Sequence, residues 1–406
     1  MQQDLSTQEL VSLLQPGDTV LIGQATAEPP GLVSMLVDAA GSVPRLTAFC
    51  GYTLSEAWKT IGTAGPRIKT YAAHGVFRDL MERGGVDMLP LHLSAVERNI
   101  VSGRLPVDVV MLQVGPMDED GYYSLGPTVD YASAALKHAR VVLLQVNQDM
   151  PRARTNRRLH ESLVTRAVDA SASLAGSPAR PPSETERRVA RNAAGLVESG
   201  ATIQLGAGAL AEAVAEELRS RRELQIRSGL VGDWLVDLYE SGAIRSGDDS
   251  TVASIALGTR RLYDFVDANP SVGFISHGEL VDPVAVAACG SYVAINSAIE
   301  VDLMGAINSE VIGGRYVGAV GGQVDFFRAT RAAPNGLAVV ALASTHPSGE
   351  SRIVTALEGP VTSLKSDVDV VVTEWGVADL RTASLEERAQ RLLAVAAPST
   401  ATTGTS

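Results

Sequence analysis

Short apolar runs, each followed by a stretch with helical spacing, recur along the chain. The run TVLIG at 19–23 precedes a proline-containing stretch where a helix could begin, and ATIQLGAGALAEAVAEELRSR at 201–221 repeats that design. The runs VDVVMLQVG at 107–115 and VDVVVTEWG at 368–376 resemble each other, and each is typical of a fully buried strand that ends at a glycine turn. Two such pairs in the same order predict two similar α/β halves, with mostly parallel sheets and helices on both faces.

A polar, proline-rich stretch, AGSPARPPSETERR at 175–188, separates the two halves. It ends in Ser183-Glu184-Thr185-Glu186, a capping box that opens the next helix. We therefore expect one domain over residues 1–180 and a second over residues 181–395.

A second capping box, from Ser384 to Glu387, predicts a C-terminal helix with the sequence SLEERAQRLLAV. Residues 396–406 show no apolar pattern, and we expect them to form a disordered tail.

Composition narrows the possible partners. The formal net charge is -12 and the sequence pI is about 5.1, which argues against nucleic acid as the main partner. An anionic small ligand stays possible, because local arginines and helix N-termini can hold one.

Location and metal content are also constrained. The N-terminus is acidic and polar, unlike a signal peptide, and no segment reaches transmembrane length, so we expect a cytoplasmic chain with no membrane partner. Cys50 and Cys289 form no CxxC motif, and the six histidines form no HxH or HxxxH pair. We therefore expect ordinary thiols and no metal site.

Two glycine-containing turns are candidate ligand sites. In GAGALAEAV at 206–214, small residues would let a ligand approach the backbone, and the helix that follows would favour an anion. In GAVGGQVDFFRAT at 318–330, the amides of Gly321 and Gly322 could face a developing oxyanion. An ordinary tight turn is the alternative for the first stretch, and a β-bulge or strand crossing is the alternative for the second.

Several polar side chains are further candidates. His277 and Glu279 in SHGELVDP could act as acid or base, although one histidine in a loop is more often incidental. Ser344 and His346 in STHPSGESRIV could contact a ligand, or could belong to a solvated loop. Asn296 lies in a probable strand pair, where structural hydrogen bonding is the alternative to ligand contact.

Many ungapped stretches together resemble the acetyl-CoA hydrolase/transferase family, which includes 4-hydroxybutyrate CoA-transferases. In the first half they are LPVDVVMLQVGPMDEDGYYSLG and VNQDMPR; in the second they are ATIQLGAGALAEAV, ALGTRRLYDFVDANP, VAINSAIEVDLMG, GGQVDF, SRIV and VVTEWGVADLR. The resemblance implies two similar CoA-transferase-like α/β domains with the active site between them, and a homodimer. Coenzyme A would then be part of a substrate or product, with no tightly bound cofactor.

The family's nucleophile is missing from this chain. The resemblance implies that a glutamate carboxylate attacks an acyl-CoA thioester and passes through a glutamyl-CoA intermediate. The family's glutamate lies in a stretch similar to L-G-I-H-T-E-M, which reads LQIRSGL here, so its position falls on Gly229 and the preceding pair becomes Arg227-Ser228. The lysine that the family commonly carries in the loop at STHPSGES is also absent, and His277 and Glu279 differ from the family's usual residues.

The resemblance and the missing glutamate together predict an enzyme that acts on an acyl thioester by hydrolysis, direct acyl transfer, cyclisation or decarboxylation, without glutamyl-CoA. A non-catalytic acyl-CoA-binding protein or partner subunit stays an alternative, as does a CoA-transferase whose carboxylate has moved to Glu279 or Glu374. The acyl group and the acceptor cannot be predicted from the sequence.

The resemblance also implies roles for individual residues. Asn296 and Glu374 would orient the substrate, and the amides of Gly321 and Gly322 would lie near the thioester oxygen. The predicted substrate and CoA contacts are Gly206, Ala207, Gly208, Ala209, Leu210, Gln323, Ser344 and His346.

Overall fold

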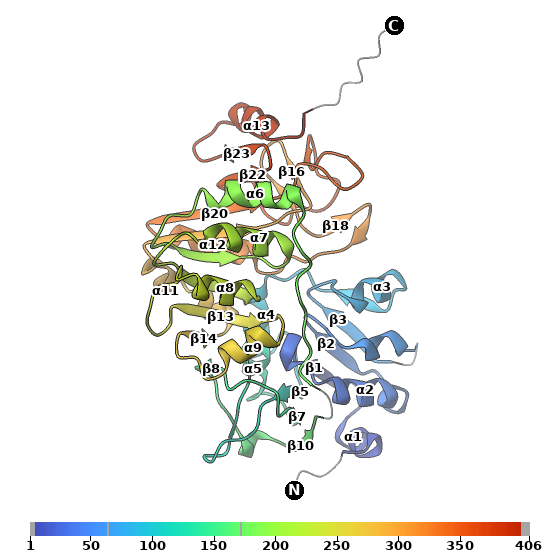
Figure 1. The fold of residues 1–406 in the computed structure, drawn as a ribbon. Coiled ribbons are helices and arrows are strands. Elements are labelled where there is room, and N and C mark those ends of the chain that lie inside the picture. Colours follow the sequence, from blue (N-terminus) through green and yellow to red (C-terminus); the bar gives the residue numbers. More distant parts are fainter. Residues whose placement is uncertain (1–4, 63–64, 171–172, 399–406) are drawn as a thin grey trace.

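Two parallel β-sheets organise the chain, one built mainly from each half (Figure 1). The computed structural model describes residues 5–62, 65–170 and 173–398 of the 406-residue chain. In Figure 1 the first half, in blue to green, lies below most of the second half. This confirms the predicted α/β class with mostly parallel sheets.

Within the described residues, the first sheet has seven parallel strands in the order β10-β7-β5-β1-β2-β3-β4. They are β1 (Thr19–Ile22), β2 (Thr47–Cys50), β3 (Arg67–Thr70), β4 (Val86–Met88), β5 (Val109–Val114), β7 (Val141–Val146) and β10 (Arg166–Asp169). β5 and β7 are buried along their whole length, which explains their nearly continuous apolar sequences.

Helices cover both faces of the first sheet. They are α1 (Thr7–Leu13), α2 (Pro30–Ala39) and α3 (Val76–Glu82) on one face, and α4 (Leu93–Val101) and α5 (Tyr131–Ala135) on the other. The alternation of side chains along β1 produces the two layers: Val20 and Ile22 pack with the first group, and Leu21 packs with the second.

The second sheet has nine strands among the described residues, and of these only the edge strand β23 runs antiparallel to its neighbour. The strands, in sheet order, are β23 (Gly376–Asp379), β22 (Val370–Thr373), β20 (Asn335–Ala341), β15 (Ser291–Asn296), β11 (Thr202–Leu205), β12 (Gln225–Val231), β13 (Thr251–Ala256), β14 (Val272–Phe274) and β8 (Arg154–Thr155).

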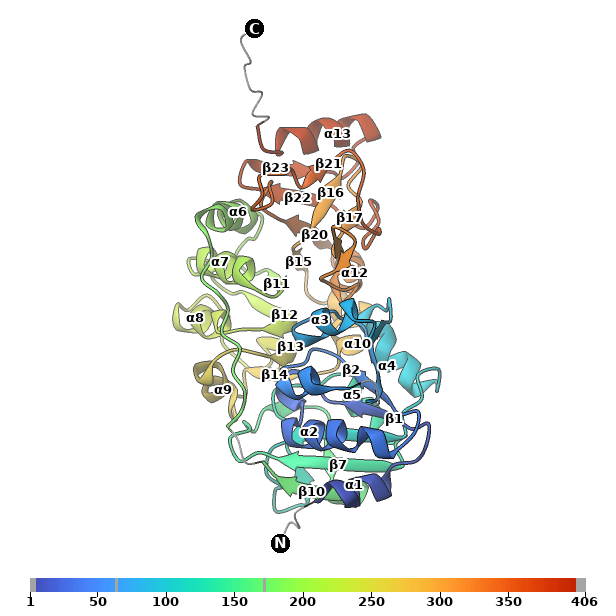
Figure 2. The ribbon, with the colours of Figure 1, turned by 90° about the vertical axis from the view of Figure 1, so that its right-hand side faces the viewer.

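Eight helices accompany the second sheet in the described chain. They are α6 (Glu184–Ala194), α7 (Ala209–Leu218), α8 (Trp234–Glu240), α9 (Arg260–Val266), α10 (His277–Leu280), α11 (Pro283–Ala287), α12 (Gln323–Ala329) and α13 (Leu385–Ala394). Figure 2 shows α6 to α9 stacked along one face. Residues of α10 to α13 belong to a separate apolar cluster on the other face.

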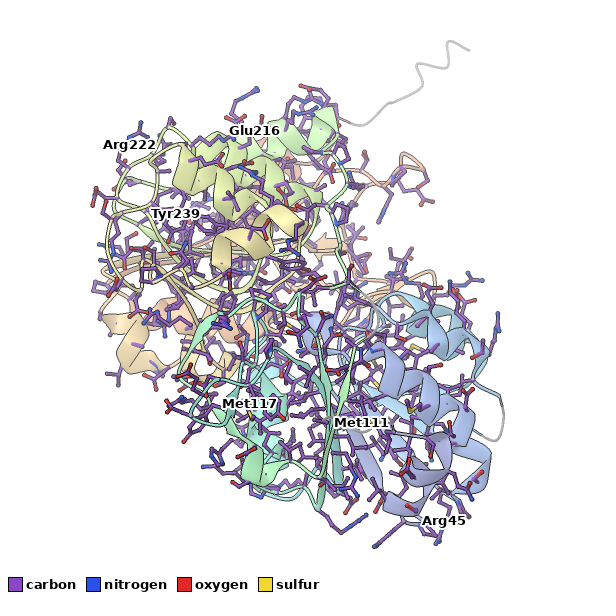
Figure 3. All side chains as sticks on the ribbon, turned by 60° about the horizontal axis from the view of Figure 1, so that its bottom comes forward. Arg45, Met111, Met117, Glu216, Arg222 and Tyr239 are labelled. Atoms are coloured by element: carbon purple, nitrogen blue, oxygen red, sulfur yellow. The ribbon has the colours of Figure 1, made fainter. Side chains whose placement is uncertain are left out.

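Short strands form small sheets outside the two main ones. They are β6 (Tyr122–Tyr123) with β9 (Leu159–His160), β16 (Glu300–Asp302) with β17 (Ile307–Asn308) and β21 (Ile353–Val354), and β18 (Val311–Ile312) with β19 (Arg315–Tyr316). Figure 3 shows the side chains of the whole molecule: Met111 of β5 lies among its neighbours, whereas Arg45 and Arg222 extend from the surface.

The two main sheets share one strand plan. β1 has β2-β3-β4 on one side and β5-β7-β10 on the other, and β11 has β12-β13-β14 and β15-β20-β22 in the corresponding places. The predicted match of 19–23 with the start of 201–221 is therefore confirmed. The predicted match of 107–115 with 368–376 is wrong: β5 corresponds to β15, and β22 corresponds to β10. Any fully buried parallel strand gives a valine-rich run, so composition alone cannot establish correspondence.

Local signals located the helix starts correctly. Pro30 is the first residue of α2, and the capping boxes that open α6 and α13 are both formed. Most of the predicted tail, residues 399–406, lies outside the described residues. The longest described helix, α6, has 11 residues, and none of the described helices has the length and apolarity needed to cross a membrane.

The two halves share an apolar core and direct backbone hydrogen bonds. One cluster of buried side chains includes Val96 of α4 as well as Leu205 of β11 and Val214 of α7. Val129 N donates to Ser254 O over 2.8 Å. β8, from the first half, pairs with β14 of the second sheet. The division near residue 180 stays a prediction.

A buried carboxylate sits at the carboxyl edge of the first sheet. Asp130 accepts hydrogen bonds from Gln24 Nε2 at 2.5 Å and from Ala132 N at 2.8 Å. The amide oxygen of Gln24 is used by Tyr71 OH and Tyr52 N, so the amide cannot turn round without losing these bonds. Burial raises the pKa of Asp130 to about 6.

We predict that Asp130→Asn becomes more stable relative to the natural chain as pH rises from 4 to 7. A raised pKa means that the folded chain holds the proton more tightly than the unfolded chain, so this contribution is complete below pH 4 and is lost as pH rises through 6. The expected change in the difference of unfolding free energies is roughly 2–3 kcal/mol. The lost hydrogen bond adds an offset independent of pH. Chemical denaturation at several pH values would test this, and a constant difference would contradict it.

Candidate active site

The carboxyl ends of parallel strands in the second sheet carry most of the predicted site residues. Glu374 follows β22, Ser344 follows β20, Asn296 ends β15, Gly206 follows β11 and Gly229 lies on β12, and these strands are neighbours in that order. Four inter-strand spacings of about 4.8 Å separate β22 from β12, so this edge extends over roughly 19 Å. Ligands commonly bind at this edge of open α/β sheets.

Gly229 lies beside two aromatic rings. A Cβ atom built on Gly229 would stand 3.2 Å from Cε2 of Phe326 and 3.7 Å from Nδ1 of His277. A Cβ on Gly322 would stand 2.7 Å from Cε1 of the same histidine. The structure therefore brings together three of the predicted residues, Gly229, His277 and Gly322.

His277 is held by a carboxylate, which a serine holds in turn. It opens α10 and is only 4% exposed, and its Nε2 lies 3.2 Å from Oδ2 of Asp325. Ser94, from the first half of the chain, donates to Asp325 through Oγ at 2.6 Å and through its backbone N at 2.9 Å. Burial alone would raise the pKa of Asp325, but the hydrogen bonds from His277 and Ser94 outweigh it and hold the pKa below its ordinary value.

The loop that carries the paired glycines is fixed to the first half. Leu93 N donates to Gly321 O at 2.9 Å, Ala73 N donates to Gly318 O at 3.2 Å, and Gly321 forms a parallel bridge with His92. Gly321 has φ +56°, a conformation that glycine adopts without a steric penalty. Among the described residues, the N–H of Gly322 donates to no backbone carbonyl in the loops and turns.

The turn at 206–210 and Asn296 line one small cavity. It is bounded by Gly206, Ala207, Leu210 and Asn296, among others. Asn296 and Gln204 exchange two amide hydrogen bonds of 2.7 and 3.2 Å, which fix the orientation of Asn296. Gly208 and Ala209 begin α7 and do not line this cavity.

Gln323 has mainly structural partners. Its Nε2 donates to Ser297 O at 2.8 Å, and its Oε1 accepts from Ser309 and Ser363. The side chain thereby joins the glycine loop to the segment after β15.

Glu374 and Ser344 bind each other at the far end of the edge. Ser344 donates to the carboxylate through N at 2.8 Å and Oγ at 2.7 Å, and Trp375 Nε1 donates to Ser344 Oγ. Burial, followed by the charge of Arg352, lowers the pKa of the nearby His346. These groups stand well away from Gly229 along the edge.

Glu279 and Ser228 have structural hydrogen bonds that the sequence interpretation missed. The Glu279 carboxylate accepts from Ser276 N at 3.0 Å, which closes a capping box, and from Asn156 Nδ2 at 2.7 Å. The spacing Ser276-x-x-Glu279 is the signal that could have predicted this. Ser228 donates its hydroxyl to the carbonyls of Leu205 and Leu230, from a fully buried position.

Three other residues near Gly229 and His277 had little or no sequence signal for their place in the site. Ser94 and Asp325 are 231 residues apart, so no local pattern could pair them. Phe326 looks like any apolar residue on a helix, yet its ring forms a wall beside Gly229. Within the described residues, no group of three or more His, Cys, Asp or Glu side chains is placed to bind a metal ion.

Comparison with known proteins identifies related sequences along nearly the whole chain. The model of the acetyl-CoA hydrolase/transferase N-terminal domain matches residues 2–160, and that of the C-terminal domain matches residues 258–403. A 4-hydroxybutyrate coenzyme A transferase of Clostridium kluyveri is 33% identical over 404 residues, covering 97% of this chain and 94% of that protein. A succinyl-CoA:cyclohexane-1-carboxylate CoA transferase of Geobacter metallireducens is 33% identical over 408 residues, covering 98% of this chain and 93% of that protein.

Solved structures agree with this. The crystal structure of RipA from Yersinia pestis has a TM-score of 0.89 and 31% identity, covering 97% of this chain and 94% of that one. A 4-hydroxybutyrate CoA-transferase from Porphyromonas gingivalis has a TM-score of 0.79 and 30% identity, covering 97% and 93%.

We predict that Gly322→Ala destabilises the chain, because the new methyl group would stand 2.7 Å from His277 and must push the ring away from Asp325. The expected loss in unfolding free energy is about 1–3 kcal/mol, as for overpacking elsewhere. Gly62→Ala is the control, because its Cβ would meet no heavy atom within 4 Å. Chemical denaturation of both variants measures the effect. Equal stability of the two variants would show that the ring accommodates the methyl group.

Proposed function

We propose that this chain, which belongs to the acetyl-CoA hydrolase/transferase family, binds an acyl-CoA at the carboxyl edge of the second sheet. It then passes the acyl group directly to an acceptor. No glutamyl-CoA intermediate forms on this route, because glycine occupies position 229. Coenzyme A is a substrate component and a product.

The surroundings of Gly229 are the observation that supports this proposal. Phe326 and His277 stand at 3.2 and 3.7 Å from the point where a side chain would begin, and the carboxylate in this group, Asp325, is already bound by His277 and Ser94. The enzyme therefore presents no nucleophile of its own to the thioester, so the acceptor must attack the thioester directly.

The carboxylates that could replace the family's glutamate are already held by hydrogen bonds, which makes them less suitable as nucleophiles. Glu279 is engaged by Ser276 and Asn156, and Glu374 by both donors of Ser344. Asp233, close behind Gly229 in sequence, accepts from N and Oγ1 of Thr259. Moving any of them to a thioester would break at least two hydrogen bonds.

Stabilisation of the oxyanion falls to the glycine loop. When an acceptor oxygen attacks the carbonyl carbon, negative charge develops on the carbonyl oxygen until the carbon–sulfur bond breaks. The loop with Gly321 and Gly322 is fixed next to His277 by hydrogen bonds from the first half, and the N–H of Gly322 is the donor that would bind the oxyanion. Such a preorganised donor is typically worth about 3–4 kcal/mol of barrier.

The rest of the edge would hold the coenzyme. Small residues at 206–210 would let the coenzyme approach the backbone there, near Asn296. Ser344, His346 and Glu374 lie further out, where the nucleotide end of the coenzyme would extend. We expect the protein to act as a homodimer, as the resemblance implies.

Water fits the acceptor position better than a bulky group. The ring of Phe326 already stands 3.2 Å from a would-be methyl group on Gly229, so a large amine or alcohol would need a larger movement of the ring than water would. Hydrolysis is accordingly the preferred reaction, and direct transfer to a small acceptor is the next candidate.

We predict that the natural chain releases free CoA from at least one acyl-CoA without forming a protein-bound CoA adduct. A panel of acyl-CoAs, with and without carboxylic acid, amine and alcohol acceptors, would be followed by thiol assay and mass spectrometry. Gly229→Glu tests whether the family's nucleophile can be restored, and Gly229→Gln matches its size without a nucleophile. CoA adducts that form only in the Gly229→Glu variant, at the introduced carboxylate, would support the proposed loss of the covalent route.

Two outcomes would contradict the proposal. Binding of acyl-CoA without turnover, in the presence of every acceptor, would make the chain a binding protein. A CoA adduct on Glu279 or Glu374 of the natural chain would establish a relocated nucleophile instead.

A further inference from the structure

We infer that His277 is the general base of this site: its Nδ1 takes the proton from the attacking water, while Asp325 and Ser94 hold the ring in the required orientation and tautomer. This inference rests on the proposed function and deepens it. It assigns a catalytic group to the position that a glycine leaves without a nucleophile.

The tautomer follows from the contact with Asp325. A carboxylate can only accept a hydrogen bond, so Nε2 of His277, at 3.2 Å from Oδ2, carries the hydrogen. The neutral ring then has its lone pair on Nδ1. An imidazole bound in this way by a carboxylate is the arrangement that general bases use in other hydrolytic sites.

Nδ1 is a buried acceptor without a partner. Among the described residues it is one of few buried side-chain polar atoms with no hydrogen bond. Such an atom costs about 1–3 kcal/mol when it is left unsatisfied, which makes an accidental arrangement unfavourable. It lies 3.7 Å from the would-be Cβ of Gly229, on the side where the resemblance puts the reacting thioester.

The ring of Phe326 controls access to Nδ1. The two rings meet edge to face, with centroids 5.0 Å apart and planes at 80°. Because Nδ1 is enclosed by this ring and Gly229, a water molecule within hydrogen-bonding distance requires the Phe326 ring to shift slightly. Catalytic hydrogen bonds commonly shorten only when the substrate is bound.

Arg227 fixes the helix that carries the base. It lies two residues before Gly229 on the same face of β12, and it donates through Nε and Nη2 to Leu280 O and Glu279 O, both at 2.6 Å. α10 is thereby tied to the strand that holds Gly229. Arg227 is a positioning residue, since it acts through the helix and not on the substrate.

The step balances as a hydrolysis. The water oxygen forms a bond to the thioester carbonyl carbon, and one water proton moves to Nδ1. The carbon–sulfur bond then breaks with its electron pair on sulfur, and the Nδ1 proton passes to the thiolate. The products are a carboxylic acid and free CoA, and His277 is again neutral.

The test is chemical rescue of His277→Ala in the full-length protein. We expect kcat for thioester hydrolysis to fall about 100- to 10,000-fold, with acyl-CoA affinity little changed. Imidazole should enter the vacated space and restore hydrolysis in a saturable manner. His138→Ala, which removes an exposed histidine elsewhere, controls for the direct reaction of imidazole with the thioester and should show no enzyme-dependent gain.

Further variants make the test decisive if the alanine variant folds poorly. His277→Gln keeps a donor for Asp325 but no base, and it should lose kcat to a similar extent. Asp325→Asn should lower kcat with a smaller effect on the apparent KM, because the ring loses its orientation. Circular dichroism checks the fold of each variant.

The outcomes separate this inference from the proposed function. Hydrolysis by the natural chain together with natural kcat in His277→Ala overturns the base assignment alone. Loss of kcat without imidazole rescue, accompanied by loss of acyl-CoA affinity, overturns it in favour of a packing role. Absence of CoA release by the natural chain overturns the proposed function itself.

Discussion

The hydrogen bonds from Ser94 to Asp325 join the two halves of the chain at the point where the chemistry is proposed to occur. A carboxylate that is largely buried would be costly without donors, and here two of its three hydrogen bonds come from the other half. Asp325 in turn determines how His277 lies against Gly229 and Gly322. The site therefore forms only when the halves are docked, and the backbone bonds at Gly318 and Gly321 reinforce the same junction.

Gly229, His277 and Arg227 are physically linked in the structure. Glycine at 229 leaves space for the rings of His277 and Phe326. A Cβ atom at this position would already stand 3.2 Å from Cε2 of Phe326 and 3.7 Å from Nδ1 of His277. Arg227, in the same stretch, holds the carbonyl end of the helix that begins with His277. On the proposed route, Gly229 supplies no nucleophile, His277 lies beside it, and Arg227 secures the helix that begins with His277.

Much of the fold could be predicted from the sequence because its signals are local. Buried parallel strands give apolar runs, and Pro30, Ser183 and Ser384 mark helix starts by capping chemistry. The same capping-box spacing, from Ser276 to Glu279, would have predicted the structural role of Glu279. The predicted correspondence between β5 and β22 was wrong because the composition of a strand does not indicate its position in a sheet. The partnership of Ser94 with Asp325 depends on docking of the halves, which leaves no trace in local sequence.

The size of the space at Gly229 decides between the possible acceptors. A route through an enzyme-bound intermediate lets donor and acceptor occupy the same space in turn. Direct attack requires both to be present together, so the acceptor must fit between the thioester, His277 and Phe326. The ring of Phe326 leaves little room there, which favours the smallest acceptor, and water is also the acceptor that a neutral imidazole activates most simply. On the proposed route, a glycine at position 229 therefore requires donor and acceptor to bind at the same time, and this suits the scaffold to hydrolysis.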